Sequence, residues 1–177
     1  MTQHLVLTIL THDQPNTLAQ LTQFLASHHC QIQSSRMLVL GEEFAMLILI
    51  NGPWNQIAKL ETHLPDFATK HDLTVQFKRT ELHQLDKKKW IPYSVELISH
   101  DSNGIIETIC SFFTDAGAVI YEVQNNNYTA NPVGIPMFSL AMRILVPADS
   151  QLSDLRERFI NICDFLNVDA YLEPERA

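Results

Sequence analysis

The chain carries one pattern of elements twice, and this repeat constrains the fold more than any other feature. Thr11 opens the polar segment THDQPNTL, and Ser99 opens the similar segment SHDSNGII 88 positions later. The same shift superimposes the apolar residues that come before each segment: Leu5, Leu7 and Ile9 fall on Tyr93, Val95 and Leu97. Because these residues alternate with others, each set predicts a strand, and the chain consists of two copies of one unit.

The rest of each copy follows the same order. Helical spacing predicts two amphipathic helices per copy, and short apolar runs predict three further strands. The apolar residues that predict the first helix are Leu18, Leu21, Phe24 and Leu25 in the first copy and Ile106, Ile109, Phe112 and Phe113 in the second. Those that predict the second helix are Ile57, Leu60, Leu64 and Phe67 in the first copy and Leu152, Leu155, Phe159 and Ile162 in the second. Pro65 interrupts one of them, so we expect that helix to end or kink near Leu64.

Each copy therefore reads strand–helix–strand–strand–helix–strand. This order predicts an α+β protein of two tandem ferredoxin-like βαββαβ domains, each an antiparallel four-stranded sheet with both helices on one face. We place the first domain at 1–80, a charged linker at 81–91 and the second domain at 92–177. The second copy has about six extra residues within 125–136, whose Asn, Pro and Gly content predicts a loop or a longer hairpin.

The two copies differ on the sheet face that helices cannot cover. Val6, Leu10 and Leu47 make that face apolar in the first copy, whereas Ser94 and Glu96 make it polar in the second. We expect the apolar face to be buried against the second copy or against a second chain, as in a homodimer. The alternative is a central strand that tolerates some apolar exposure.

Composition excludes several functions. With 12 Lys and Arg against 20 Asp and Glu, the net charge of −8 argues against a broad nucleic-acid surface. The three cysteines are widely spaced, which favours neither a disulfide framework nor a zinc site. The longest apolar run, 44–50, is too short to span a membrane, and the first residues do not resemble a signal peptide, so we expect a cytoplasmic protein.

The repeated polar segment has two readings. Asp13 and Asp101 can cap the helices that follow, with Pro15 in a first helical turn and Gly104 supplying flexibility. The same geometry can also receive a free amino acid, because a helix start attracts a carboxylate and an Asp beside it can hold an ammonium group. Composition does not separate these readings.

Nothing recurs beside the segment that would support covalent chemistry. His12 and His100 match in position, but no nucleophile, third ligand or second carboxylate accompanies them. The adjacent pair His28 and His29 is a poor metal site, since neighbouring side chains on a helix do not share a face. With no phosphate loop, GxSxG or HExxH motif, we expect no enzyme, no metal and no cofactor.

The two units, each with an Asp-x-Pro-Gly-like turn before the first helix, resemble tandem ACT domains, regulatory modules that commonly bind amino acids. In ACT proteins ligands lie between this turn of one module and the second strand of a neighbour. The resemblance implies ligand-binding residues in the first copy at His12, Asp13, Asn16, Thr17, Ser34, Ser35 and Arg36, and in the second at Asp101, Asn103, Gly104, Ile105, Glu122, Gln124 and Asn125. The first copy departs from the family with Asn16 in place of Gly, and the second with Asn103 in place of Pro.

A narrower resemblance comes from the Ser-Arg, Gly-Glu-Glu-Phe and Gly-x-Trp-Asn elements, in that order, within 30–65. They are similar to the glycine cleavage system transcriptional repressors. The resemblance implies a protein without a DNA-reading domain that represses glycine cleavage genes by binding a LysR-type transcriptional activator, and glycine relieves the association.

Three alternatives stay open. An acylphosphatase-like enzyme on the same fold needs a phosphate-cradling loop beside an Arg and an Asn, which neither copy has. An RNA-binding sheet needs clustered aromatic residues and a basic surface. An ACT-type oligomerisation or regulatory module would keep the fold and bind a different small ligand, or none.

Overall fold

The computed structural model describes residues 2–12, 16–82, 89–100, 103–132 and 134–175. The chain divides into two compact units, Met1–His83 and Gln84–Ala177, and each is described by itself. Part of the expected linker, 83–88, lies outside the described residues. The elements of the first unit are β1 (Thr2–His12), α1 (Thr17–Ser27), β2 (Gln31–Leu40), β3 (Glu43–Pro53), α2 (Trp54–Lys70) and β4 (Thr74–Thr80). Those of the second are β5 (Trp90–Ser99), α3 (Ile105–Asp115), β6 (Val119–Ala130), β7 (Ile135–Pro147), α4 (Leu152–Leu166) and β8 (Asp169–Pro174).

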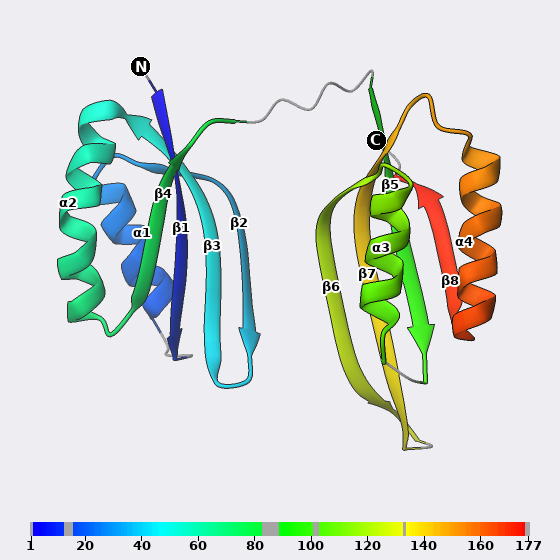
Figure 1. Ribbon diagram of the computed structural model, residues 1–177. Coiled ribbons are helices and arrows are strands. Elements are labelled where there is room, and N and C mark those ends of the chain that lie inside the picture. The colour runs from blue at the N-terminus through cyan, green and yellow to red at the C-terminus, as the bar shows by residue number, and fades with distance from the viewer. Residues whose placement is uncertain (1, 13–15, 83–88, 101–102, 133, 176–177) are drawn as a thin grey trace. The chain divides into compact units, whose positions relative to one another are not determined.

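Each unit is a four-stranded antiparallel sheet with two helices on one face (Figure 1). The strand order is β2-β3-β1-β4 in the first unit and β6-β7-β5-β8 in the second. The predicted α+β class and the βαββαβ order of both copies are confirmed.

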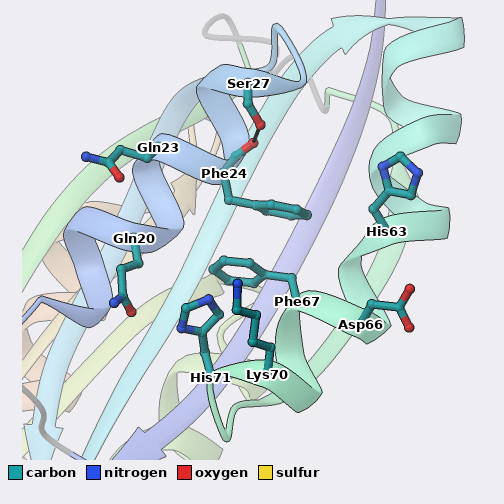
Figure 2. A pocket seen from close by; sticks show the side chains of 9 residues that line it. All are labelled: Gln20, Gln23, Phe24, Ser27, His63, Asp66, Phe67, Lys70 and His71. Carbon is teal, nitrogen blue, oxygen red and sulfur yellow. Dashed lines mark hydrogen bonds between the residues drawn. The ribbon is translucent and has the colours of Figure 1, made fainter.

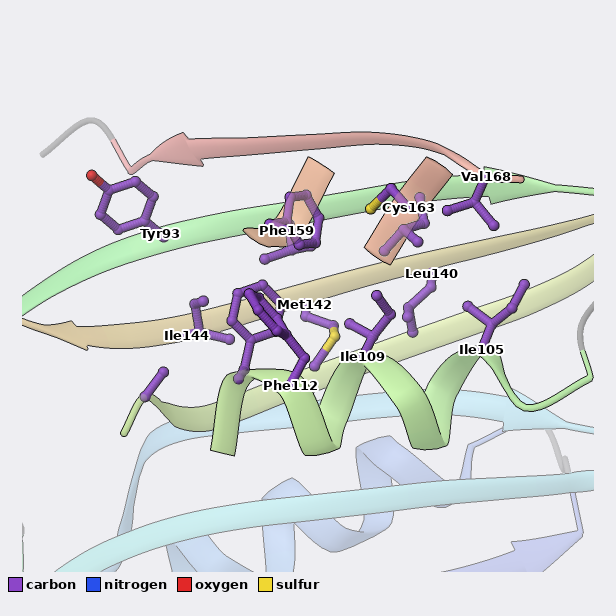
Figure 3. Packing of buried hydrophobic residues seen from close by; sticks show 14 of the residues in the cluster. Tyr93, Ile105, Ile109, Phe112, Leu140, Met142, Ile144, Phe159, Cys163 and Val168 are labelled. Carbon is purple, nitrogen blue, oxygen red and sulfur yellow. The ribbon is translucent and has the colours of Figure 1, made fainter. Parts of the chain in front are cut away.

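The alternating apolar residues of the sequence form the two cores. In the first unit, Leu5 and Leu7 of β1 are fully buried beneath Leu21 of α1 and Leu60 of α2. In the second, the residues shown in Figure 3 pack between the sheet and α3 and α4, with Phe113 and Val95 fully buried. Each helix buries one apolar stripe, which is why the spacing of these residues predicts the elements well.

The strand registers extend the repeat to the backbone. The pairing of β2 with β3 shifts between Ile32 and Ser34, and the pairing of β6 with β7 shifts between Ile120 and Glu122, which are the corresponding positions. The extra residues of the second copy lengthen the β6–β7 hairpin, whose last pair is Ala130 with Ile135. The longer hairpin expected at 125–136 is therefore confirmed.

Helix α2 does not end near Leu64, so that prediction is wrong. The helix continues through Pro65 to Lys70. Leu64 and Ala68 are both buried against the sheet, and this packing outweighs the one backbone hydrogen bond that a proline removes.

Within the first unit, only the sheet face toward the helices is buried. On the face opposite the helices, Leu10, Leu38 and Leu47 are 43%, 46% and 49% exposed. We call this face, with Val6 and Leu49 at its centre, the outer face of the first unit. Its cover by a second copy or a second chain stays a prediction.

Among the described residues, no helix is long and apolar enough to cross a membrane. The same part of the chain contains no group of three or more His, Cys, Asp and Glu residues that could hold a metal ion. Cys30, Cys110 and Cys163 are free thiols, and burial raises the pKa of Cys163 to about 11. A thiol with a raised pKa carries little thiolate at neutral pH and is a weak nucleophile.

Candidate functional site

The two polar segments lead into helices α1 and α3 through the same backbone conformation. The residues at the N-cap positions are Asn16, with φ 82° and ψ −11°, and Gly104, with φ 71° and ψ −4°. Each carbonyl accepts the first helical hydrogen bond at 2.9 Å, and neither N-cap residue caps its helix with a side chain. The proposed caps Asp13 and Asp101 lie outside the described residues, as does Pro15.

The other predicted residues of these segments differ in what they can offer a ligand. Thr17 and Ile105 are 7% and 2% exposed, so their side chains face the core. His12 and Asn103 are exposed. The His12 Nδ1 atom lies 3.4 Å from Glu43 Oε1, an exposed contact without a nucleophile among its described partners.

In the first unit the predicted strand residues lie far from the turn. Ser34 and Arg36 are on the outer face, whereas Ser35 lies opposite buried Ile48. His12 is level with Leu40 across β3, four residues beyond Arg36 along β2. At about 3.3 Å per residue, this separation is about 13 Å, so the two sets do not form one pocket within the unit.

In the second unit the structure brings two of the predicted residues into a polar cavity. Glu122 and Gln124 of β6 line a cavity of about 230 Å³ on the sheet face opposite the helices, whereas Asn125 lies opposite buried Leu140. The side chains of Ser94 and Glu96 of β5, Arg143 of β7 and Glu175 after β8 line it as well. We call it the sheet-face cavity.

Arg143 is the centre of an ion-pair network at this cavity. Its Nε and a terminal nitrogen donate to the two carboxylate oxygens of Glu175, the latter at 2.6 Å, and its other terminal nitrogen lies 3.5 Å from Glu122. The Tyr121 hydroxyl donates to Glu175 at 3.2 Å, and the guanidinium lies over the Tyr121 ring. The hydrogen bonds from Arg143 hold the pKa of the Glu175 carboxyl below its ordinary value of 4.5, while burial raises the pKa of Tyr121.

Sequence reasoning did not assign Ser94, Glu96, Arg143 and Glu175 to a site. A signal was present, because Ser94 is polar where the first copy has Val6, and Glu96 is charged where the first copy has the neutral Thr8. Arg143 matches Leu49 of the first copy in position. Strand pairing places Ser94 opposite Arg143 and Val6 opposite Leu49, on the corresponding sheet faces of the two units. Because only the second copy has a charged residue at this position of a central strand, Arg143 indicates a role that the first copy lacks.

A further cavity lies between helices α1 and α2, with a volume of about 610 Å³ (Figure 2). The stacked rings of Phe24 and Phe67, with centroids 4.1 Å apart, form its floor. Near it, His28 Nε2 lies 2.9 Å from His63 Nδ1, while His28 Nδ1 donates to the Phe24 carbonyl oxygen. These contacts join the two helices, which favours a structural role.

Comparison with known proteins identifies the relatives of this chain. Residues 3–78, the first unit, match the ACT domain family. The glycine cleavage system transcriptional repressor of Escherichia coli (strain K12) is 28% identical over 167 residues, which are 93% of this chain and 86% of the repressor. The repressor of Shigella flexneri matches to the same extent.

Solved structures agree with this assignment. The crystal structure of a candidate glycine cleavage system transcriptional repressor matches with a TM-score of 0.71 at 28% identity and covers 100% of this chain and 99% of that one. An unknown protein from Galdieria sulphuraria matches with a TM-score of 0.78 at 22% identity. The match covers 99% of this chain and 100% of that one and shows that the fold is shared. The first unit is an ACT domain, the second repeats its fold, and the chain as a whole is a tandem ACT-domain homologue of the glycine cleavage system transcriptional repressors.

Proposed function

We propose that this protein is an amino-acid-responsive transcriptional regulator that represses glycine cleavage genes by binding a LysR-type activator rather than DNA. Glycine is the proposed signal. The observation that carries the proposal is the similarity to the Escherichia coli repressor, which runs through both units and 93% of the chain.

Charge supports binding to a protein rather than to nucleic acid. The net charge is −8, and affinity for DNA backbones depends mainly on Lys and Arg. The homology is to a regulator, so the chain is a non-enzymatic regulatory protein.

The proposed ligand contacts come from two places. The starts of α1 and α3 offer the backbone N–H groups of a first helical turn and the left-handed residues Asn16 and Gly104. The second strands offer Arg36 in the first unit and Glu122 in the second, both at least partly accessible. We propose that a turn of one chain and a strand of a second chain together hold the ligand, since those of the first unit lie about 13 Å apart along the strands.

The test is co-purification of the full chain with a LysR-type activator from the same cells, with and without glycine. We expect a complex without glycine and less complex when glycine is added. A thermal-shift titration with amino acids runs in parallel, because a ligand selective for the native state raises the unfolding temperature. Absence of a complex in both conditions contradicts the proposed partner. If no amino acid of the panel changes the unfolding temperature, the alternative of an oligomerisation module is favoured.

A further inference from the structure

We propose that His28 and His63 form a proton-sensitive link between helices α1 and α2 of the first unit, which holds at neutral pH and breaks when both imidazoles are protonated. The two rings come from different elements, since His28 follows the last residue of α1 and His63 lies within α2. Their facing nitrogens, Nε2 of His28 and Nδ1 of His63, are 2.9 Å apart, which is a hydrogen-bonding distance. This inference is independent of the proposed glycine response.

The position of one proton in the pair follows from its neighbours. His28 Nδ1 lies 2.8 Å from the Phe24 carbonyl oxygen, which only accepts hydrogen bonds. The Ser27 hydroxyl donates to the same carbonyl at 2.7 Å, so its oxygen, 3.2 Å from His28 Nδ1, is an acceptor as well. His28 Nδ1 therefore carries a hydrogen. In the neutral ring the Nε2 atom then has a lone pair, which accepts the hydrogen bond from His63 Nδ1–H.

The hydrogen bond between the rings tolerates one added proton but not two. If His63 gains a proton, its Nδ1–H still donates to His28 Nε2; if His28 gains it, the direction of the bond reverses. With two added protons, both facing nitrogens carry N–H groups and no acceptor is left. Two like charges then lie on rings whose centroids are 5.2 Å apart. The second proton therefore removes the contact that joins the helices.

The charged groups at the cavity between the helices do little to compensate that second proton. Helix α1, Thr17–Ser27, contains no Asp, Glu, Lys or Arg. On α2, His63 and Asp66 lie one turn apart at the cavity (Figure 2). Lys70 and His71 line the same cavity, and the charge of Lys70 opposes that of Asp66.

The remaining charged groups of these elements do not favour a second proton either. Glu61, the other carboxylate of α2, pairs with Arg79 of β4 at 2.6 Å. Lys59, one turn before the second histidine of the pair, is a cation, and His29, next to the first, becomes one at acid pH. The sheet beneath the helices contributes apolar core residues.

The second unit has the same helical layer without the pair. At the positions of His28 and His63 it has Ala116 and Arg158. The Arg158 guanidinium lies over the Phe112 ring, 5.5 Å from its centroid. The fold therefore does not require two facing imidazoles, and we assign the proton-sensitive link to the first unit alone.

The test is a double-mutant cycle of His28→Ala and His63→Ala in the full chain, measured by urea denaturation with EDTA present. A Trp90→Phe background leaves Trp54 as the fluorescence probe of the first unit. Measurements at about pH 7.5 and about pH 5 lie on either side of the ordinary histidine pKa of about 6.5. EDTA excludes a metal ion held by the two imidazoles as the source of any coupling.

At the higher pH we expect the two residues to be coupled at least about twofold in the folding equilibrium constant, as for a hydrogen bond. At the lower pH the coupling should disappear or change sign. The sign follows from proton binding: the folded chain with an intact link carries at most one added proton on the pair, whereas the unfolded chain takes up two. The contribution of the link therefore falls as the pH falls.

His71→Ala is the matched control, because it removes an imidazole from the same cavity, where His71 contacts the Phe67 ring with centroids 4.4 Å apart. Its cycle with His28→Ala should show no coupling at either pH. Equal coupling of His28 and His63 at both pH values, or no coupling at the higher one, overturns the inference. Titration of the histidine side chains of the natural chain by NMR is a second measurement, which does not depend on a variant that folds. The pair should take up its two protons in separate steps, and uptake by both rings in a single step overturns the inference as well.

Discussion

Asn16 and Gly104 share a left-handed backbone conformation in which a side chain with a Cβ is strained. A Cβ added at Gly104 would have no atom within 4 Å, so its cost is backbone strain alone. We expect Gly104→Ala to lower the free energy of unfolding by about 1–2 kcal/mol, and Asn16→Ala to lower it by less. Asn16→Gly should be nearly neutral. Urea denaturation measures all three variants. A Gly104→Ala variant as stable as the natural chain would contradict the left-handed conformation at this turn.

A second effect at the residue scale is the pH dependence that Glu175 brings. Its pKa is lowered by Arg143, so the pair stabilises the fold above the unfolded pKa, and this contribution is lost as pH falls through the folded pKa. We expect Glu175→Gln to cost a few tenths to about 1 kcal/mol at neutral pH, since the pair is partly exposed. The difference from the natural chain should shrink as pH falls below about 4.5.

Thermal unfolding of both chains across this pH range measures the difference. Glu173→Gln, an exposed change on β8 two residues before Glu175, is the control. A difference that grows toward acid pH would show that the sign is wrong.

At the scale of elements, helix α2 keeps its length despite Pro65. The proline has no N–H to donate to the Glu61 carbonyl, and its side chain is exposed, so the core does not require it. We expect Pro65→Ala to raise the free energy of unfolding by about 1–3 kcal/mol, partly offset by the more flexible unfolded chain. Asp66→Ala, next to it and also exposed, is the control in urea denaturation. A loss of stability would mean that packing of α2 depends on the proline.

At the scale of the whole molecule, the apolar outer face of the first unit predicts association of two chains into a homodimer. Leu47 lies on this face and is 49% exposed. We expect sedimentation to detect a dimer, and Leu47→Lys to weaken it at least about tenfold, because a charge in an apolar interface is costly. Ala141→Lys places the same charge at the matching position of the second unit and should leave the dimer intact. A monomer at all concentrations would mean that the face meets a different partner.

Much of this architecture follows from local pattern. The alternation of Leu5, Leu7 and Ile9 and the helical spacing of the next apolar residues predict the element order, because each element buries one face. The repeat makes these predictions stronger, since the pattern that predicts each element occurs in both copies. Pattern fails at Pro65, where burial of Leu64 and Ala68 outweighs a local preference for ending the helix.

The sheet-face cavity could not be predicted in the same way. Alternation shows that Ser94 and Glu96 share a face, but it does not show which residues of other strands lie beside them. Arg143 and Glu175 reach this place through the pairing of β5 with β7 and β8, and Glu122 through that of β6 with β7. The order of elements is encoded within short segments, whereas the charges around Arg143 come from β5, from β6 and from the residue after β8, which meet only when the sheet forms.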